Sequence, residues 1–333
     1  MLRRILMICI AAGILTDPGG LARASSIKIR FTHQFPETHF VAKEVRHFAG
    51  LVEQKSAGKV VLEIFPAAQA YKPAEVIEAV VTGAIEAGMT TNMDWSGIIP
   101  AMDVFVVPYL ITSYPVIEAA LSGEVGKKLF QLMEGKGVKP LLWFFQTRTM
   151  VYTSRDKPLK LPEDFRGKKM RGTSKIMNKG VEALGASPVS VSGPEVYMAL
   201  QHGTIDIGLT DVSAALARHY YEVHKYATVT NDFAVSFVAF MNPKLWNSIP
   251  PDGQKAIMDA ARETQAKTLK DSEIEKDKSI NELKAKGMIL HIQTPEEAKA
   301  WEKATAPVLD YFLQTAGAPA KELVEIIRKL KAQ

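Results

Sequence analysis

The first part of the chain alternates between the two-residue hydrophobic period of a strand and the longer period of an amphipathic helix. Because helices that follow strands in turn pack on both faces of one sheet, this order predicts a wound α/β unit. The predicted strands are 27–32, 60–65, 87–91 and 138–145, and the predicted helices are 41–55 and 74–82.

The second part of the chain repeats this alternation, and the chain is long enough for two domains. Two α/β units are therefore predicted. Pro158 and Pro162 mark a plausible crossing between the units. The predicted strands are 168–171, 189–191 and 205–209, and the predicted helices are 176–184, 195–201 and 212–220.

One long segment, 254–286, contains neither glycine nor proline, and Gly287 follows it before a strand-like stretch at 288–292. A single helix of this length would measure about 50 Å. Its apolar residues are too sparse for a coiled-coil seam, so a strut across both units is predicted. Two helices with a break between them remain the alternative.

The first 24 residues have the features of a signal peptide. Arg3 and Arg4 precede an apolar run at 5–15, and Ala22-Arg23-Ala24 gives the small-x-small pattern that a signal peptidase cuts. The run is too short to span a bilayer, which takes about 20 residues. We expect export to the periplasm with cleavage after Ala24; an uncleaved anchor is the alternative.

The remaining composition narrows the function further. The only cysteine, Cys9, lies in the leader, so the exported chain is expected to have no disulfide and no cysteine chemistry. Loss of the leader lowers the formal charge from +5 to about +3. The basic residues are dispersed, which argues against nucleic-acid binding and suits a small anionic solute.

Strong catalytic motifs are absent from the sequence. It has no HExxH, paired CxxC, GxSxG, Walker or GxGxxG pattern, so no metal or cofactor is expected. His219 and His224 are five residues apart, which does not place them on one helical face. Asp206 and Asp211 are candidate general bases, although Asp206 fits a turn or strand-edge acid better.

Arg171 is the first candidate for ligand binding. The predicted strand 168–171 runs directly into Gly172-Thr173-Ser174. In an open α/β sheet the ligand crevice lies beyond the carboxyl ends of the strands. A guanidinium offers two parallel N–H donors that match the two oxygens of a carboxylate and keeps its charge at physiological pH. The position therefore predicts a carboxylate clamp.

Three stretches together resemble the solute-binding proteins of tripartite ATP-independent periplasmic (TRAP) transporters. They are 162–171 (PEDFRGKKMR), 185–188 (GASP) and 195–206 (EVYMALQHGTID). The stretches 65–69 (FPAAQ), 107–109 (VPY) and 220–226 (YYEVHKY) also match, so the resemblance extends over nearly the whole mature chain.

The resemblance implies a two-domain α/β periplasmic binding protein fold of class II type, with a long helix bracing both domains. Residues 25–146 and 236–277 would form domain I, and residues 147–235 and 278–333 would form domain II. The cleft between them would close over a small organic acid, which a membrane permease then receives. No enzymatic step is implied.

The resemblance also assigns roles to particular residues. Arg171 would pair with the solute carboxylate, and Arg148 would assist it. The chain departs from many relatives at Thr210 and Asp211, positions that usually tune specificity. Thr91 and Gly193 stand where sialic-acid binders carry Glu and Phe, which disfavours that ligand. Further candidates for contact with the solute are Asn92, Trp95, Phe145 and Tyr197.

Two other functions stay open on the sequence. A secreted α/β enzyme would use Asp206 or Asp211 as a general base on a small carboxylate, although the missing nucleophile and metal motifs argue against it. A sensory receptor would bind the same kind of ligand and pass its bound form to a signalling partner.

Overall fold

The computed structural model describes residues 26–332, so the predicted leader and its cleavage site after Ala24 lie outside the described residues. The first sheet has five strands in the order β2-β1-β3-β10-β4. Strand β1 pairs in parallel with β2 and β3, whereas β10 runs antiparallel to β3 and β4. Their bounds are β1 Ile27–Thr32, β2 Val60–Phe65, β3 Ala87–Thr91, β4 Lys139–Phe145 and β10 Ser236–Met241.

The second sheet has the order β11-β9-β5-β8, and a parallel pair of strands, β6 and β7, lies beside it. An isolated bridge between Met170 of β6 and Ile207 links that pair to the segment before β8. The bounds are β5 Met150–Ser154, β6 Lys169–Gly172, β7 Ser187–Ser190, β8 Gly208–Asp211, β9 Tyr226–Thr230 and β11 Ile289–Ile292.

Helices and short 3-10 turns connect and cover the strands. The helices are α1 Phe40–Lys55, α2 Val76–Thr82, α3 Asn92–Trp95, α4 Tyr114–Ser122, α5 Glu124–Glu134, α6 Lys175–Ala183, α7 Val196–Gln201, α8 Val212–Ala217, α9 Pro243–Ser248, α10 Pro251–Ala285, α11 Pro295–Thr305 and α12 Pro307–Lys331. The 3-10 turns are η1 Pro73–Glu75, η2 Pro100–Val106, η3 Pro162–Phe165, η4 Gly193–Glu195 and η5 Tyr220–Glu222. Within residues 26–332 no helix combines the length and apolar character that a membrane span requires.

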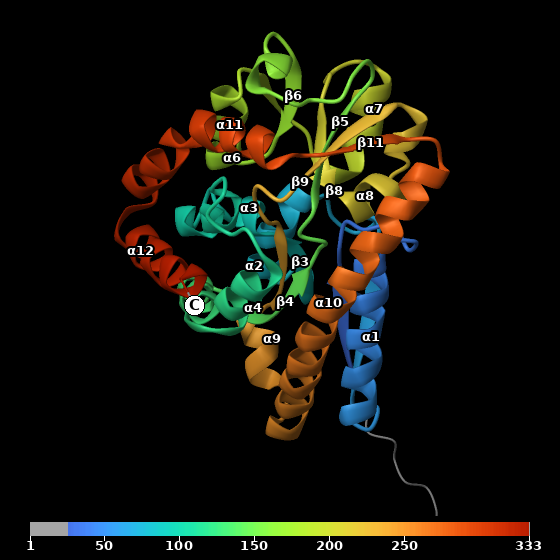
Figure 1. Ribbon diagram of the computed structural model, residues 1–333. Helices are drawn as coiled ribbons and strands as arrows, with labels where there is room; N and C mark the ends of the chain where they lie inside the picture. Colours follow the sequence, from blue (N-terminus) through green and yellow to red (C-terminus); the bar gives the residue numbers. More distant parts are fainter. Residues whose placement is uncertain (1–25, 333) are drawn as a thin grey trace, which may run out of the picture.

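The chain crosses between the sheets twice in the middle of the sequence, from β4 to β5 and from β9 to β10. The crossing predicted at Pro158 and Pro162 was wrong, because β5, which ends at Ser154, already belongs to the second sheet. Helix α10 joins the two lobes as well, because it packs against α1 and β4 of the first lobe and against α8 of the second. Figure 1 shows it running obliquely along one side of the molecule. The predicted single strut is thus confirmed, with 35 residues in one unbroken helix.

Two predicted boundaries were wrong for local reasons. The strand expected at 205–209 begins only at Gly208, because the backbone N–H groups of Asp206 and Ile207 both donate to Lys169 O. The helix expected at 212–220 ends at Ala217, since His219 adopts a left-handed conformation with φ 59°.

The C-terminal helix α12 was not predicted at all. It is kinked at Gly317, whose φ is 70°, and packs mainly on η2, α4 and α6. The first two of these belong to residues 25–146 and the third to residues 147–235. The exact division of the chain into two domains therefore stays a prediction, with α12 in contact with both parts.

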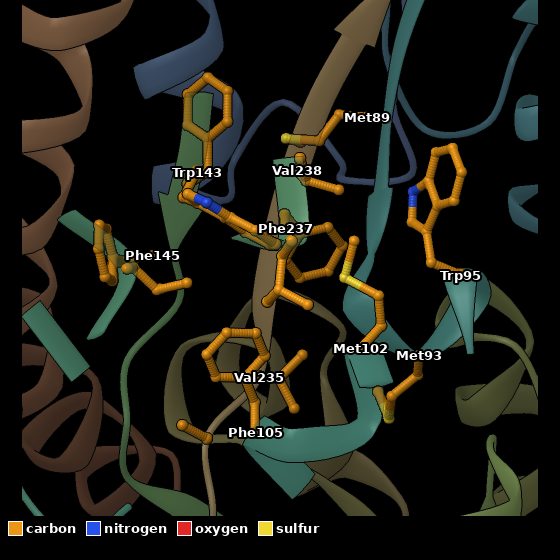
Figure 2. Packing of buried hydrophobic residues seen from close by; sticks show 14 of the residues in the cluster. Met89, Met93, Trp95, Met102, Phe105, Trp143, Phe145, Val235, Phe237 and Val238 are labelled. Atoms are coloured by element: carbon orange, nitrogen blue, oxygen red, sulfur yellow. The ribbon is translucent and has the colours of Figure 1, made fainter. Parts of the chain in front are cut away.

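A continuous apolar core fills the first lobe and extends into the second, where a smaller cluster surrounds Val151 and Leu283. Figure 2 shows Trp95 and Phe145 among the packed side chains of the larger core. Trp95 is fully buried and meets Phe240 edge to face, with 4.9 Å between ring centroids. This geometry is typical of aromatic packing in protein interiors.

Candidate functional site

A small cavity lies where the two lobes meet. Gln34, which follows β1, and Phe237 of β10 line it from the first lobe, while Arg171 of β6 and Arg218 after α8 line it from the second. Gln146 and Val235 belong to the two connections between the lobes and also face it. The cavity therefore lies between the lobes and beside both connections, so a relative motion of the lobes would open or close it.

Three larger hollows lie elsewhere among the described residues. The first is lined by Arg155, Lys157 and Asp164, of which Lys157 and Asp164 already form an ion pair. The second lies between Tyr109 and the end of α12. The third lies between Lys128 of α5 and Glu322 of α12. None of the three has residues from both connections, so the interlobe cavity is the better candidate for a closing binding site.

Arg171 lies at this cavity with only 8% of its surface exposed. Its Nε donates to Val191 O at 3.0 Å and its Nη1 donates to Leu209 O at 2.6 Å. These two bonds fix the plane of the guanidinium and leave the rest of its donors for another partner. Burial lowers the pKa of Arg171, and the phenol of Tyr220 opposes that shift.

Arg218 is a second arginine at the cavity, which we did not predict from the sequence. It stands one residue after the short helix α8, and its guanidinium lies 5.9 Å from the ring centroid of Phe35. Its Nε is buried without a hydrogen-bond partner among the described residues. The sequence offers no motif at this position, so only the folded chain brings Arg218 to Arg171.

Gly193 makes room for Arg218. A Cβ at this position would lie 2.7 Å from Gln34 Oε1 and 2.8 Å from Arg218 Nη2, closer than side-chain atoms normally approach. The absence of a side chain thus lets η4, from one lobe, lie directly against Gln34 from the other. Gln34 and Gln146 were likewise not predicted.

Thr91, Thr210 and Asp211 also line the cavity. Thr91 and Asp94 form a capping box at the start of α3, in which Thr91 Oγ1 donates to Asp94 Oδ2 at 2.7 Å. Asp211 is the N-cap of α8, and its Oδ1 accepts from Ser213 N at 2.9 Å. Burial raises the pKa of Asp211. Thr91 and Asp211 therefore cap the N-termini of α3 and α8 at the seam between the lobes.

Arg148 does not line this cavity. Its Nη2 donates to Ile111 O at 3.0 Å and to Asn231 O at 2.5 Å. Burial lowers its pKa to about 10, and the carboxylate of Asp232 opposes that shift. Because Arg148 and Asn231 belong to the two interlobe connections, this side chain ties those connections together.

The other predicted contacts are also placed outside the cavity lining. Asn92 is fully buried, where its Nδ2 donates to Met102 O at 3.1 Å and its Oδ1 accepts from Ser236 N at 3.1 Å. Trp95 and Phe145 belong to the core. Tyr197 donates to Glu222 Oε2 at 2.9 Å on the outside of α7. Phe237 is the aromatic ring that the cavity does contain.

Of the groups considered for catalysis, only Asp211 lines the interlobe cavity; Asp206 and His224 line a separate hollow. Asp206 Oδ2 accepts from Lys169 N at 2.7 Å, as expected of a turn acid, and does not line the interlobe cavity. His224 Nδ1 lies 3.0 Å from Thr153 Oγ1, whereas His219 pairs with Glu222. In the part of the chain from 26 to 332, no three His, Cys, Asp or Glu side chains cluster as metal ligands would.

Comparison with known proteins decides the family. The model of the DctP family, described as bacterial extracellular solute-binding protein, family 7, matches residues 31–315. The chain belongs to this family. Its family 7 relatives include the C4-dicarboxylate-binding periplasmic protein DctP of Rhodobacter capsulatus, which is 31% identical over 95% of this chain and 96% of that protein.

Solved structures agree with this family 7 assignment. A TRAP periplasmic solute-binding protein from Sulfurospirillum deleyianum with bound succinate has a TM-score of 0.86 at 25% identity, covering 92% of this chain and 99% of that one. The sugar acid binding protein from Advenella mimigardefordensis in complex with galactonate has a TM-score of 0.87 at 23% identity, with the same coverage. The two-domain periplasmic binding protein fold is thereby confirmed.

Proposed function

We propose that this TRAP solute-binding protein captures a small organic acid in the interlobe cavity and delivers it to a membrane permease without changing it chemically. The observation that carries the proposal is the pair of arginines, Arg171 and Arg218, at a cavity that both lobes enclose. A carboxylate is the natural partner of a guanidinium held in a fixed plane.

The arginines alone do not account for tight binding. A hydrogen bond to a charged group contributes roughly 1.5–3 kcal/mol net, whereas micromolar affinity corresponds to about 8 kcal/mol. The remainder must come from exclusion of water around the ion pair and from burial of apolar ligand surface. Phe237, Met177 and Val235 supply such surface in the cavity. Closure of the lobes is therefore part of the affinity.

Few polar contacts cross the seam beside the cavity. Thr173 Oγ1 lies 2.9 Å from Met93 Sδ, and Ser213 Oγ lies 3.4 Å from His39 Nε2. Weak contacts of this kind are compatible with lobes that separate and close again. We propose that the motion occurs at residues 146–149 and 231–235, the two connections that Arg148 ties together.

A thermal-shift screen of mono- and dicarboxylates, keto acids, sugar acids and aromatic acids tests the proposal. A ligand present at about 100 times its dissociation constant adds roughly 2.7 kcal/mol to the free energy of unfolding. Mass spectrometry of solute retained through purification complements the screen. A protein that no carboxylate stabilises would contradict the proposal.

The enzyme and the sensory receptor are separated from a carrier by different measurements. Prolonged incubation with a bound acid should return that acid unchanged, and appearance of a product would favour the enzyme. Uptake of the acid by cells that express the cognate permease should depend on this protein, whereas a sensor would leave uptake unaffected.

We also propose that the signal peptide is removed after Ala24. N-terminal sequencing of the exported protein should then give Ser25 as the first residue.

A further inference from the structure

Asp211 has one saturated oxygen and one free oxygen. Its Oδ1 accepts from Thr147 Oγ1 at 2.7 Å, from Ser213 N at 2.9 Å, from Ala214 N at 3.3 Å and from Ser213 Oγ. Its Oδ2 is buried and has no hydrogen-bond partner among the described residues. Since Asp211 is 1% exposed and lines the interlobe cavity, a group bound in the cavity is the available partner.

The opposite lobe offers a second free acceptor. Gln34 is 7% exposed and lines the same cavity, and its Oε1 has no partner in the described part of the chain. A buried acceptor left unpaired is costly. An oxygen of a carboxylate cannot relieve that cost, because it is itself only an acceptor. A ligand that satisfies this cavity therefore needs an O–H or N–H group as well as a carboxylate.

The charges around the cavity limit the ligand further. The guanidinium groups of Arg171 and Arg218 are matched in number by the carboxyl groups of Asp211 and Asp94, each of which is electrostatically linked to Arg171. Tyr220 and His39 also lie beside the arginines, and both are neutral at physiological pH, because burial raises the pKa of Tyr220 and lowers the pKa of His39. Because these charges already cancel, a second carboxylate would bring a further uncompensated negative charge into a buried site, so a ligand with one carboxylate suits the cavity better than a ligand with two.

Building on the proposed function, we propose that the ligand is a monocarboxylate with an additional hydroxyl or N–H donor, and that this donor binds Asp211 Oδ2. Arg171 and Arg218 hold the carboxylate, and Asp211 selects the donor-bearing acid over its counterpart without the donor.

The variant Asp211→Asn tests this role without removing the helix cap. Asparagine also caps helices through its side-chain oxygen, so Asn Oδ1 can replace Asp211 Oδ1 at the start of α8. Its amide then presents N–H donors where Oδ2 was an acceptor. Asp206→Asn is the matched control, because it makes the same chemical change at a residue that does not line the cavity.

Dissociation constants are measured by calorimetry for three pairs of acids that differ in one donor. Lactate and propionate test a hydroxyl next to the carboxylate. Pyroglutamate and its lactone analogue, in which an oxygen replaces the N–H, test a nitrogen donor. Malate and succinate test the hydroxyl on a dicarboxylate. In the parent protein we expect a donor-bearing monocarboxylate to bind about tenfold or more tightly than its partner and more tightly than succinate.

Asp211→Asn should reduce this preference to about threefold or less, while Asp206→Asn keeps it. The proposal is overturned if no donor-bearing acid binds more tightly than its partner, if succinate binds most tightly, or if Asp211→Asn leaves the preference unchanged. In those cases binding of any carboxylate still supports the proposed function. Failure of every carboxylate to bind contradicts both.

Discussion

Replacement of Arg171 by lysine is the most direct test of the carboxylate clamp. The substitution keeps one positive charge but removes the planar fork. In the parent protein one N–H of Nε and one of Nη1 are used by Val191 O and Leu209 O, so three of the five guanidinium donors remain for a ligand. A lysine has three donors on a single nitrogen and cannot serve both carbonyls and both carboxylate oxygens.

The expected loss follows from these bonds. Loss of one charge-assisted hydrogen bond to the ligand costs roughly 1.5–3 kcal/mol, which corresponds to about a ten- to hundredfold weaker affinity. Loss of the bond to Val191 O or Leu209 O leaves a buried carbonyl unpaired and lowers the free energy of unfolding by about 1–3 kcal/mol. The fold itself should persist, because the core does not include Arg171.

Titration calorimetry with the acid identified in the screen measures the first effect, and urea unfolding without ligand measures the second. Arg166→Lys is the control, since Arg166 is an exposed arginine in the same segment and does not line the cavity. If Arg171→Lys binds the acid with unchanged affinity while remaining folded, the clamp assignment is refuted.

Three further outcomes are expected. Gly193→Val should weaken acid binding about tenfold or more in calorimetry with little change in thermal stability, because its Cβ would displace Arg218; unchanged affinity would contradict this. Arg148→Met should lower the free energy of unfolding by about 2–4 kcal/mol in urea titration, since Ile111 O and Asn231 O both lose their donor; a loss of affinity alone would instead favour direct ligand contact. Burial raises the pKa of Asp103 from 3.8 to about 7, so its contribution to stability is present at low pH and is lost as the pH rises through 7. Asp103→Asn should remove roughly 2–3 kcal/mol of the fall in unfolding free energy between about pH 5 and 8, and an unchanged pH profile would refute that role.

Local patterns in the sequence were enough for much of the architecture. Strands β1 and β2 each have one face that is more exposed, so their hydrophobic residues alternate visibly along the sequence. Helix α10 has no proline after its first residue, so its length is also visible in the sequence. Strands β5, β9 and β10, which are buried almost throughout, were missed, whereas the equally buried β3 was predicted. A strand buried on both faces loses the alternation that identifies it. Placement of Arg171 at the end of a strand was likewise a local feature, and the structure puts it at the cavity.

The sequence by itself determined part of the alternation of strands and helices, the long brace and the motif around Arg171, since each depends on residues that are neighbours along the chain. Only the tertiary structure decided which side chains share the cavity. Gln34, Gly193 and Arg218 come together from separate elements, while Arg148 is drawn to backbone oxygens of the interlobe connections. Hydrogen-bond partners distant in sequence make that choice, because a buried guanidinium must bind whichever acceptors the fold brings within its reach.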